Sequence, residues 1–383
     1  MNLSVTHRTA YAPPVEFVER KGVGHPDTIC DALADDLARK LATEYLAHTG
    51  RVQHFNVDKA VLAAGSVEVD YGGGHHTKAS RLVLVGKADF SQSWRPEPEA
   101  LAVEYKRKLL EILPDAGEEA FDVEIWLNQS SVDLAAVMGS RDGAPLANDT
   151  SFAAVSLPHS MLEKAVYDVE RHLNDPEFRS RVPVGRDIKV MGARVGMEGR
   201  ITVAAPVMAK AVSNRSEYDD VVTLIREAAT EVADAVFGGP VEVAVNQADQ
   251  EETPYLTLTG TSAEAGDDGQ VGRGNRFGGL ITPYRPMSLE AAAGKNPASH
   301  VGKTYHAVGS DIATRLINDL DIDEVTIRLL SSIGHPVTSP QAVHLEISGD
   351  TVDEVEVLPI VEECFEDYVG VCNRLIAGHY ELF

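Results

Sequence analysis

Hydrophobic residues spaced three or four positions apart follow a glycine-containing segment near the start of the chain, at Ile29, Leu33, Leu37, Leu41 and Tyr45. This spacing predicts a helix with one buried face. The segment before it, residues 22–27, reads Gly-Val-Gly-His-Pro-Asp. Proline fixes φ at a value that suits the first turn of a helix, so we expect the helix to begin at this point.

Two interpretations of this helix start are open from the sequence. As an anion site, the glycines would let a phosphate approach the first-turn N–H groups and the positive end of the helix dipole. His25 could then donate to a developing negative charge, and Asp27 could hold a divalent metal. As an ordinary helix start, Asp27 or Thr28 would be the N-cap and His25 a surface loop residue. Gly334-His335-Pro336 has no helical pattern after it, so the triplet alone means little.

Apolar runs and alternating apolar and polar residues predict strands at residues 60–65, 82–85, 121–127, 186–191, 201–207, 241–245, 325–329 and 343–347. Helical spacing predicts further helices at residues 98–113, 161–173, 218–237 and 359–377. A hairpin-like turn is expected at residues 71–76. Because strands and helices alternate, the chain is expected to form an α+β fold, with helices covering mixed sheets.

Polar side chains accompany two of these strands. Asp187 and Lys189 lie two residues apart and therefore project from one face of their strand. Asn56 and Asp58 would share a face in the same way if the strand at 60–65 extends back to them. An ordinary exposed strand face gives the same pattern, so site and surface both stay possible.

Residues 260–279 form a glycine-rich segment that contains Asp267, Asp268, Arg273 and Arg276. Its backbone N–H groups and arginines could surround a phosphate chain, with the acids on a metal. A mobile surface loop is the alternative, although a long segment without secondary structure is uncommon unless it is functional. A second basic segment follows at residues 294–303.

Composition narrows the classes of partner. The 383 residues suffice for two or three domains, and 44% hydrophobic and 24% charged residues are typical of a globular protein. The formal charge of −25 argues against a general nucleic-acid surface and against docking on an anionic membrane. Three scattered cysteines provide neither a disulfide framework nor a zinc site. With no apolar signal segment or membrane span apparent, we expect a cytoplasmic protein with no nucleic-acid or membrane partner.

Common nucleotide-binding motifs are absent from the sequence. Gly294-Lys295 lacks the upstream glycine of a P-loop, and no dinucleotide fingerprint, kinase catalytic loop or His-Glu-x-x-His motif occurs. A nucleotide site in this chain would therefore belong to a less common type.

Five blocks in order resemble the S-adenosylmethionine synthetase (methionine adenosyltransferase) family in its archaeal-type form. They are residues 19–27, 147–151, 185–192, 260–264 with the glycine-rich segment, and 294–297. The resemblance implies three related α+β subdomains of mixed sheet covered by helices, built from non-contiguous segments. The implied boundaries are 24–117 plus 262–304 for a central subdomain, 1–23 plus 158–261 for a second, and 118–157 plus 305–383 for a third.

The same resemblance implies synthesis of S-adenosyl-L-methionine from ATP, L-methionine and water. The methionine sulfur would attack the 5′-carbon of ATP and expel tripolyphosphate, which would be hydrolysed to phosphate and pyrophosphate before release. Mg²⁺ and K⁺ are the implied cofactors. The implied assembly is a homodimer with active sites at the subunit interface.

The resemblance also suggests roles for individual residues. The implied catalytic residues are His25 at the 5′ oxygen, and Lys189 and Arg273 on the phosphate chain. Asp187 would lie near the nucleoside, and Asp267 would meet the methionine ammonium or the ribose. The other implied substrate contacts are Lys295, His300, Asp149, Gln129 and Ser130. Asp27 would hold Mg²⁺ on the phosphates, and the candidate ligands for a second Mg²⁺ are Asp58, Asp149 and Asp268.

Some positions depart from the family pattern. Gly274 and Gly302 stand where the better-known bacterial form has a lysine and a metal-binding aspartate. Phe55, Val57 and Ser130 are atypical of the archaeal-type form, which leaves an altered methionine pocket open. Two alternative functions follow, a paralogue acting on a methionine analogue and a catalytically silent nucleotide-binding regulatory subunit. The joint presence of His25, Asp27, Lys189, Arg273 and Lys295 argues against a silent protein.

Overall fold

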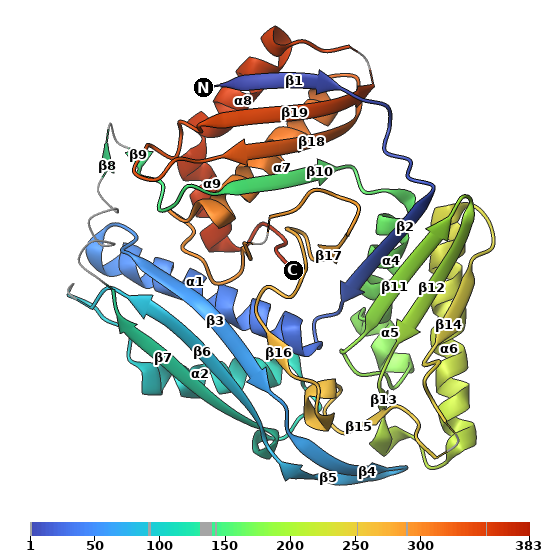
Figure 1. The fold of residues 1–383 in the computed structure, drawn as a ribbon. Helices are drawn as coiled ribbons and strands as arrows, with labels where there is room; N and C mark the ends of the chain where they lie inside the picture. Colours follow the sequence, from blue (N-terminus) through green and yellow to red (C-terminus); the bar gives the residue numbers. More distant parts are fainter. Residues whose placement is uncertain are drawn as a thin grey trace.

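Three mixed β-sheets with helices packed against them form the chain in the computed structural model (Figure 1). The structure describes residues 2–90, 93–130, 140–141, 144–250, 252–288, 290–349 and 351–383. Each of the three sheets combines parallel and antiparallel strand pairs, which confirms the expected α+β fold. Helices lie mostly behind the strands in the view of Figure 1, so each sheet turns a largely helix-free face toward the viewer.

The first sheet packs against the helix predicted from residue 26. This helix, α1 (Pro26–Thr49), buries all five apolar residues of the predicted stripe. A second helix, α2 (Pro98–Ile112), follows the predicted 98–113 segment. The strands, in spatial order, are β16 (Gly269–Gln270), β3 (Phe55–Ala63), β6 (Ser80–Ala88) and β7 (Phe121–Gln129). Because β3 begins at Phe55, Asn56 and Asp58 belong to the strand, and Asn56 Nδ2 donates to Asp58 Oδ1 at 3.3 Å.

The second sheet contains the strand that leads into α1. Its order is β14 (Glu242–Val245), β12 (Glu198–Ala204), β11 (Lys189–Val195), β2 (Val15–Lys21) and β17 (Leu280–Ile281). The helices of this region are α4 (Met161–Leu173), α5 (Pro176–Arg181) and α6 (Arg215–Phe237). The strand predicted at 186–191 is wrong in its start, because β11 begins at Lys189 and Asp187 lies in the loop before it.

The third sheet brings the two ends of the chain together. Its order is β1 (Leu3–His7), β19 (Ala342–Gly349), β18 (Ile322–Leu330) and β10 (Phe152–Leu157), with α7 (Val301–Asp319) packed against it. The single helix predicted at 359–377 is wrong, because two helices are present, α8 (Glu354–Glu366) and α9 (Tyr368–Ala377). A capping box of Asp353 and Glu356 starts α8 before Pro359, and the chain leaves helical geometry at Asp367.

Short elements complete the described chain. The turn predicted at 71–76 joins the hairpin strands β4 (Ser66–Asp70) and β5 (Gly73–Lys78). The other pairs are β8 (Ser140–Arg141) with β9 (Ala144–Pro145) and β13 (Val207–Met208) with β15 (Leu256–Thr257), and the 3₁₀ helices are η1 (Glu118–Ala120), η2 (Ala209–Ala211) and η3 (Ser262–Ala265).

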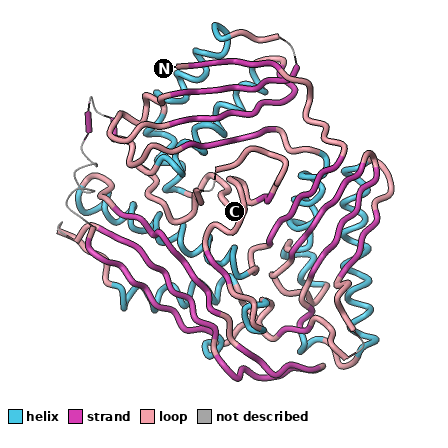
Figure 2. The backbone as a smooth tube through the Cα atoms, viewed as in Figure 1, coloured by secondary structure: helices cyan, strands magenta, loops and turns pink. Residues whose placement is uncertain are grey.

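The sheets are arranged around a centre where the C-terminus lies (Figure 2). Residues 2–23 contribute to two of them, through β1 in the third sheet and β2 in the second. The subdomain boundaries given above stay a prediction. Within the described ranges, none of the helices combines the length and apolar character that a membrane span requires.

Candidate active site

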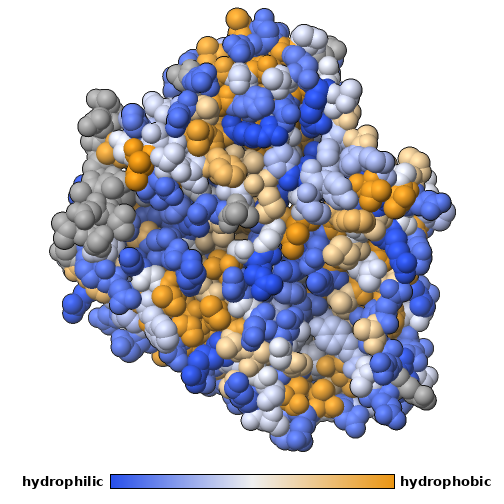
Figure 3. Space-filling view, in the orientation of Figure 1, coloured by the Kyte–Doolittle hydropathy of each residue, from blue (hydrophilic) through white to orange (hydrophobic). Residues whose placement is uncertain are grey.

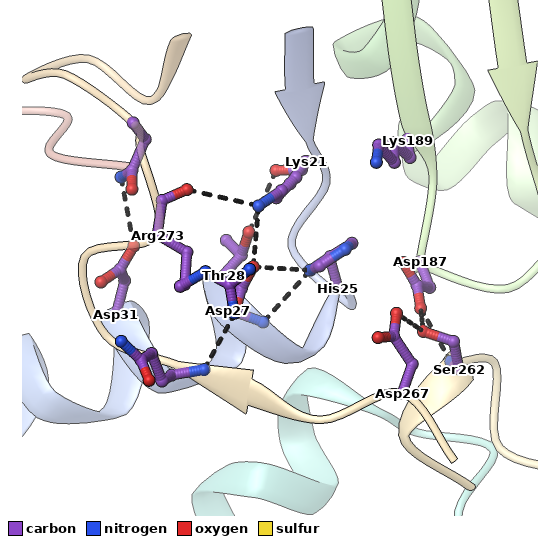
Figure 4. A network of polar contacts seen from close by, with 12 residues as sticks. Lys21, His25, Asp27, Thr28, Asp31, Asp187, Lys189, Ser262, Asp267 and Arg273 are labelled. Atoms are coloured by element: carbon purple, nitrogen blue, oxygen red, sulfur yellow. Dashed lines mark hydrogen bonds and ion pairs between the residues drawn. The ribbon is translucent and has the colours of Figure 1, made fainter. Parts of the chain in front are cut away.

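His25 is the N-cap of α1 and lies at the end of the loop after β2 (Figure 4). Its Nδ1 accepts a hydrogen bond from the Asp27 backbone N–H at 3.1 Å, and the residue is only 7% exposed. Burial lowers the pKa of His25 to about 4. The imidazole is therefore neutral near pH 7, with its proton on Nε2. The alternative with Asp27 or Thr28 as N-cap and His25 on the surface is wrong, because the histidine ring itself caps the helix.

Asp27 lies in the first turn of α1 with both carboxylate oxygens engaged. Lys21 Nζ donates to Oδ2 at 2.7 Å, and the Gln270 backbone N–H donates to Oδ1 at 2.9 Å. Lys21 Nζ also donates to the backbone carbonyl of Arg273 at 3.3 Å. An ammonium group thus lies beside Asp27 Oδ2, which shows that this position accommodates a cation.

Asp187 and Asp267 both contact Ser262 at the start of η3 (Figure 4). Asp187 Oδ2 accepts the Ser262 backbone N–H at 2.7 Å and also its hydroxyl. Burial raises the pKa of Asp187 to about 7. The Ser262 hydroxyl also lies 3.2 Å from Asp267 Oδ2, and Asp267 is exposed. The two carboxylates therefore meet around one serine, one buried and one open to a ligand.

Lys189 begins β11, opposite Lys21 of β2 in the strand register. Its Nζ pairs with Glu19 Oε1 at 3.1 Å, and its side chain is 42% exposed. In Figure 4, Lys189 lies above Asp187, and His25 lies to the left of both. Two lysines of neighbouring strands therefore flank the helix start without being buried.

Arg273 lies in a tight turn between Gly272 and Gly274, which have φ of +75° and +87°. It is exposed, and its guanidinium has no hydrogen bond or ion pair within the described part of the chain. Arg276 differs, because it is buried and its Nη2 lies 3.1 Å from Glu163 Oε1. Of the two arginines in the glycine-rich segment, Arg273 is therefore the one placed to meet a ligand.

A second cluster contains Asp58, Lys295 and His300. Lys295 Nζ pairs with Glu290 Oε2 at 3.0 Å, and Lys59 Nζ with Asp58 Oδ2 at 2.9 Å. Partial burial would raise the pKa of Asp58, but Lys59, Lys295 and His300 outweigh it and lower that pKa. Asp58 and His300 line a cleft of about 360 Å³ together with Asn56, Asn128, Asn148 and Asn296.

His300 repeats the arrangement of His25 at another helix. It is the N-cap of α7, and its Nδ1 accepts the Gly302 backbone N–H at 3.2 Å. Burial, with Lys295 and Lys303 nearby, lowers the pKa of His300 to about 3. This imidazole is likewise neutral near pH 7, and its Nε2 carries the proton.

The remaining predicted residues lie at the edges of these clusters. Gln129 Oε1 accepts the Phe90 backbone N–H at 2.8 Å. Ser130 is buried, with its hydroxyl 2.9 Å from His54 Nδ1, and His54 lines the same cleft as His300. The segment expected to continue from Ser130 as a mobile loop lies outside the described residues.

Two of the predicted acids, Asp149 and Asp268, have no contact with the other predicted site residues among the described hydrogen bonds and ion pairs. Asp149 is exposed beside Asn148, whose side chain accepts the Val301 backbone N–H at the start of α7. Asp268 Oδ1 accepts the Ala64 backbone N–H at 2.7 Å, which ties it to the end of β3. Asp268 is therefore partly used in a turn.

The two clusters are attached to different positions on α1. The first cluster comprises the residues around the start of α1, which are Lys21, His25, Asp27, Asp187, Lys189, Ser262, Asp267 and Arg273. Asp27 belongs to it, and Asp35 accepts from Lys303 Nζ and the Gly294 backbone N–H next to the second cluster. Eight residues of α-helix separate these attachment points, which is about 12 Å along the axis. The charged neighbours that shift the pKa of His25 are Asp27, Lys21, Asp267 and Lys189, whereas those of His300 are Lys295, Lys303, Asp58 and His54. The predicted site residues therefore form two separate groups within one chain.

The acids fit a magnesium ion that shares its shell with substrate. Across the described segments, no three His, Cys, Asp or Glu side chains are grouped to hold a metal by themselves. Mg²⁺ usually binds through one or two carboxylates plus phosphate oxygens and water. Asp27 matches that requirement, since its outer oxygen already binds an ammonium group.

The sequence prediction missed three residues in or beside the first cluster, which are Lys21, Ser262 and Asp31. The sequence gives no strand signal for Lys21, because Phe17 and Val18 are adjacent and residues 19–21 are all polar; only the strand register places this lysine opposite Lys189. Ser262 and Asp31 gave no signal either, because their contacts join distant parts of the chain. Ser262 meets Asp187, and Asp31 meets Gly272 and Asn275 where the glycine-rich segment returns to α1.

The chain resembles known proteins over nearly its full length. Residues 3–379 match the family model described as S-adenosylmethionine synthetase (AdoMet synthetase). The "Probable S-adenosylmethionine synthase" of Aquifex aeolicus is 42% identical over 353 residues, covering 90% of this chain and 88% of that protein. The S-adenosylmethionine synthase of Haloquadratum walsbyi is 41% identical over 382 residues, covering 96% and 95%.

A solved structure shows the same fold at low sequence identity. It is that of an unusual S-adenosylmethionine synthetase from Campylobacter jejuni, with a TM-score of 0.63 and 15% identity, matching over 94% of this chain and 93% of that one. The sequence matches, together with this fold, show that the chain belongs to the S-adenosylmethionine synthetase family.

Proposed function

We propose that this protein synthesises S-adenosyl-L-methionine from ATP, L-methionine and water, releasing phosphate and pyrophosphate. The observation that supports this most directly is the first cluster, where a neutral histidine at a helix N-terminus has two lysines, an exposed arginine and three carboxylates around it. Expelling tripolyphosphate from the 5′-carbon requires donors and cations at the oxygen that gains charge. A general base is not required, because the methionine sulfur attacks with its own lone pair.

His25 would act on the leaving oxygen as a neutral hydrogen-bond donor. The Asp27 N–H occupies Nδ1, so the ring presents Nε2–H to a ligand. A neutral imidazole can stabilise the developing charge without transferring a proton to the phosphate chain. The first-turn N–H groups of α1 and the helix dipole favour an anion at the same place.

Lys189, Arg273 and Lys295 would bind the phosphate chain. Lys189 and Arg273 are exposed enough to turn toward a ligand, and Lys295 is buried with Glu290 opposite its ammonium. Asp27 would hold Mg²⁺, which neutralises phosphate charge, once Lys21 gives up its bond to the carboxylate. Asp58, Asp149 and Asp268 are the candidates for a second ion, and the position of K⁺ stays a prediction without a named ligand.

Asp267 would bind a substrate directly, and Asp187 would lie near the nucleoside. Asp267 is exposed and suits the methionine ammonium or a ribose hydroxyl. Asp187 lies behind it and fixes Ser262. Gln129, Ser130 and His300 would complete the pocket from the second cluster.

A homodimer would join the two clusters. The clusters lie at the starts of α1 and α7, and the neighbouring sheets expose Phe17, Val61, Trp126 and Met191. Orange apolar side chains are visible over β3, β6 and β7 in Figure 3. Exposed apolar patches of this kind commonly mark protein interfaces. A two-fold pairing of these faces would bring the first cluster of one subunit to the second cluster of its partner.

Incubation with ATP, L-methionine, Mg²⁺ and K⁺ tests the proposal. S-adenosylmethionine would be followed by mass spectrometry, with phosphate and pyrophosphate measured in parallel. Methionine-dependent formation of all three products is the expected result. Binding of ATP without any product would favour the silent nucleotide-binding subunit, and a better rate with a methionine analogue in a substrate panel would favour the paralogue.

A further inference from the structure

Three buried carboxylates form a row along one side of α1, at Asp27, Asp31 and Asp35. Their spacing of four residues places them one above another on the helix, about 6 Å apart along the axis. Each accepts a backbone N–H from the returning chain, from Gln270, Gly272 and Gly294 in turn. The row therefore anchors the glycine-rich segment and the following basic segment to α1.

Asp31 differs from its two neighbours in its partners. Asp27 and Asp35 each bind a lysine ammonium. Among the described residues, Asp31 has only neutral donors, the Gly272 backbone N–H at 2.9 Å from Oδ1 and the Asn275 side-chain amide at 3.1 Å from Oδ2. It is 2% exposed. Burying a carboxylate without an opposite charge costs free energy, so stability alone does not explain why an aspartate stands at this position.

The two partners of Asp31 lie on either side of Arg273. Gly272 and Gly274 both take left-handed backbone conformations, so residues 272–275 form a tight turn with Arg273 at its exposed tip. Asp31 accepts hydrogen bonds from the first and the last residue of this turn, Gly272 and Asn275. Lys21 adds a third contact, through the Arg273 backbone carbonyl.

We propose that Asp31 is a positioning residue, which clamps the 272–275 turn and thereby directs Arg273 at the phosphate chain. The part that concerns phosphate rests on the proposed function. Asp31 contacts the turn and not the substrate. Its effect on the reaction passes through the Arg273 backbone.

A charge swap between Asp31 and Asn275 tests the clamp. Asn275→Asp alone places two carboxylates against each other in a buried site and is expected to reduce kcat about 10-fold or more. Adding Asp31→Asn restores both hydrogen bonds, with the amide now on α1 and the carboxylate on the turn. The double variant is expected to recover to within about three-fold of the parent protein. A double variant no more active than Asn275→Asp would overturn the proposal.

A second cycle asks whether Asp31 acts through Arg273. Asp31→Ala should lower kcat with a smaller change in the KM for methionine, and it should add little to Arg273→Ala. If the fold-losses in kcat of Asp31→Ala and Arg273→Ala multiply in the double variant, the two residues act independently. This result would show that Asp31 supports the fold generally, and it would refute the positioning role.

Hydrogen exchange supplies a readout that needs no activity. In Asp31→Ala the Gly272 amide loses its acceptor, so a peptide covering residues 271–276 should exchange about 10-fold faster or more. Asp36→Ala is the matched control, because Asp36 lies on the same helix but bonds Tyr105 and Lys108 of α2. The control should leave exchange at 271–276 unchanged.

Binding of inorganic tripolyphosphate, measured by calorimetry, separates the two proposals. If the parent protein neither binds it nor forms product, the proposed function fails while exchange still reports the clamp. If the parent binds it and Asp31→Ala binds it equally well with unchanged exchange, the clamp is refuted and the proposed function stands.

Discussion

At the scale of single residues, the helix N-cap decides the chemistry of both candidate histidines. His25 and His300 each direct Nδ1 at a backbone N–H of their own helix, at 3.1 and 3.2 Å. This contact fixes the tautomer, and burial keeps both rings neutral near pH 7. Each histidine thus stabilises a helix start and presents a hydrogen-bond donor, Nε2–H, to a ligand.

His25→Asn separates these two tasks. Asparagine is a preferred N-cap residue, so the free energy of unfolding should change by less than about 1 kcal/mol. The rate of S-adenosylmethionine formation should fall at least about 10²-fold, because the donor to the leaving oxygen is displaced. Urea unfolding and product formation measure the two effects. Loss of stability without loss of rate would assign His25 to the fold alone.

Lys189→Met should lower turnover by about 10²-fold or more, as the loss of transition-state charge stabilisation usually does. The side chain is 42% exposed, so the fold should tolerate the change. Lys164→Met is the control, since this exposed lysine pairs with Asp168 on the surface of α4. Near-normal rates for Lys189→Met would remove Lys189 from the mechanism.

Asp31 makes the stability of the protein depend on pH. Burial raises the pKa of Asp31 to about 7, so between about pH 4 and pH 7 the folded protein retains a proton that the unfolded chain releases. The contribution of Asp31 to stability therefore falls as pH rises through this window, by up to about 1.4 kcal/mol per pH unit. Asp31→Asn should gain in relative stability from pH 4 to pH 7 in urea unfolding. Parallel curves for the two proteins would contradict the assignment.

At the scale of elements, buried ion pairs join strands and helices that are far apart in sequence. Arg20 of β2 is 2% exposed and donates to Glu170 of α4 and to Glu381 near the C-terminus. Glu163 of α4 meets Arg276 and Arg285, at the end of the glycine-rich segment and just beyond it. These pairs secure β2 and the glycine-rich segment next to the helix start at His25.

Glu170→Ala should destabilise the protein by about 3–5 kcal/mol, because it leaves the Arg20 guanidinium buried without its main partner. Glu381→Ala is the matched comparison, since Glu381 binds the same arginine but is 40% exposed. Its loss should be no more than about 1 kcal/mol. If urea unfolding shows the same loss of unfolding free energy for both variants, the Arg20–Glu170 pair stabilises the protein no more than the exposed pair does.

At the scale of the whole molecule, the division of the candidate site into two clusters makes activity depend on pairing of subunits. If each active site takes the first cluster from one subunit and the second from its partner, variants of different clusters should complement. His25→Ala mixed with Lys295→Ala gives a mixed dimer with one intact site and one doubly altered site. Random pairing at equal amounts should recover about a quarter of the parent activity.

Denaturation and refolding of the two variants together, followed by the product assay, measures this recovery. Each variant refolded alone is the control. Activity no higher in the mixture than in the controls would place both clusters of an active site within one chain.

Elements with a long and regular hydrophobic pattern could be predicted without the structure. The stripe from Ile29 to Tyr45 and the segment 161–173 form the predicted helices, because periodic apolar residues must be buried together. The motif blocks identified the family, since their order along the chain is a property of sequence alone. The strands β1, β2 and β10 were not predicted, and the last helix was predicted as one piece instead of two.

Which candidate residues lie next to one another became known from the three-dimensional fold. It placed Asp27, Asp187, Lys189, Asp267 and Arg273 around His25, and Asp58 and Lys295 around His300. It also exposed Arg273 while burying Arg276, and it showed that Asp31 and Asp187 anchor the glycine-rich segment through Gly272 and Ser262. The physical reason is that these contacts join positions far apart in the chain, such as Asp31 and Gly272. A local pattern records propensity and burial, whereas the meeting of two distant loops depends on how the sheets pack.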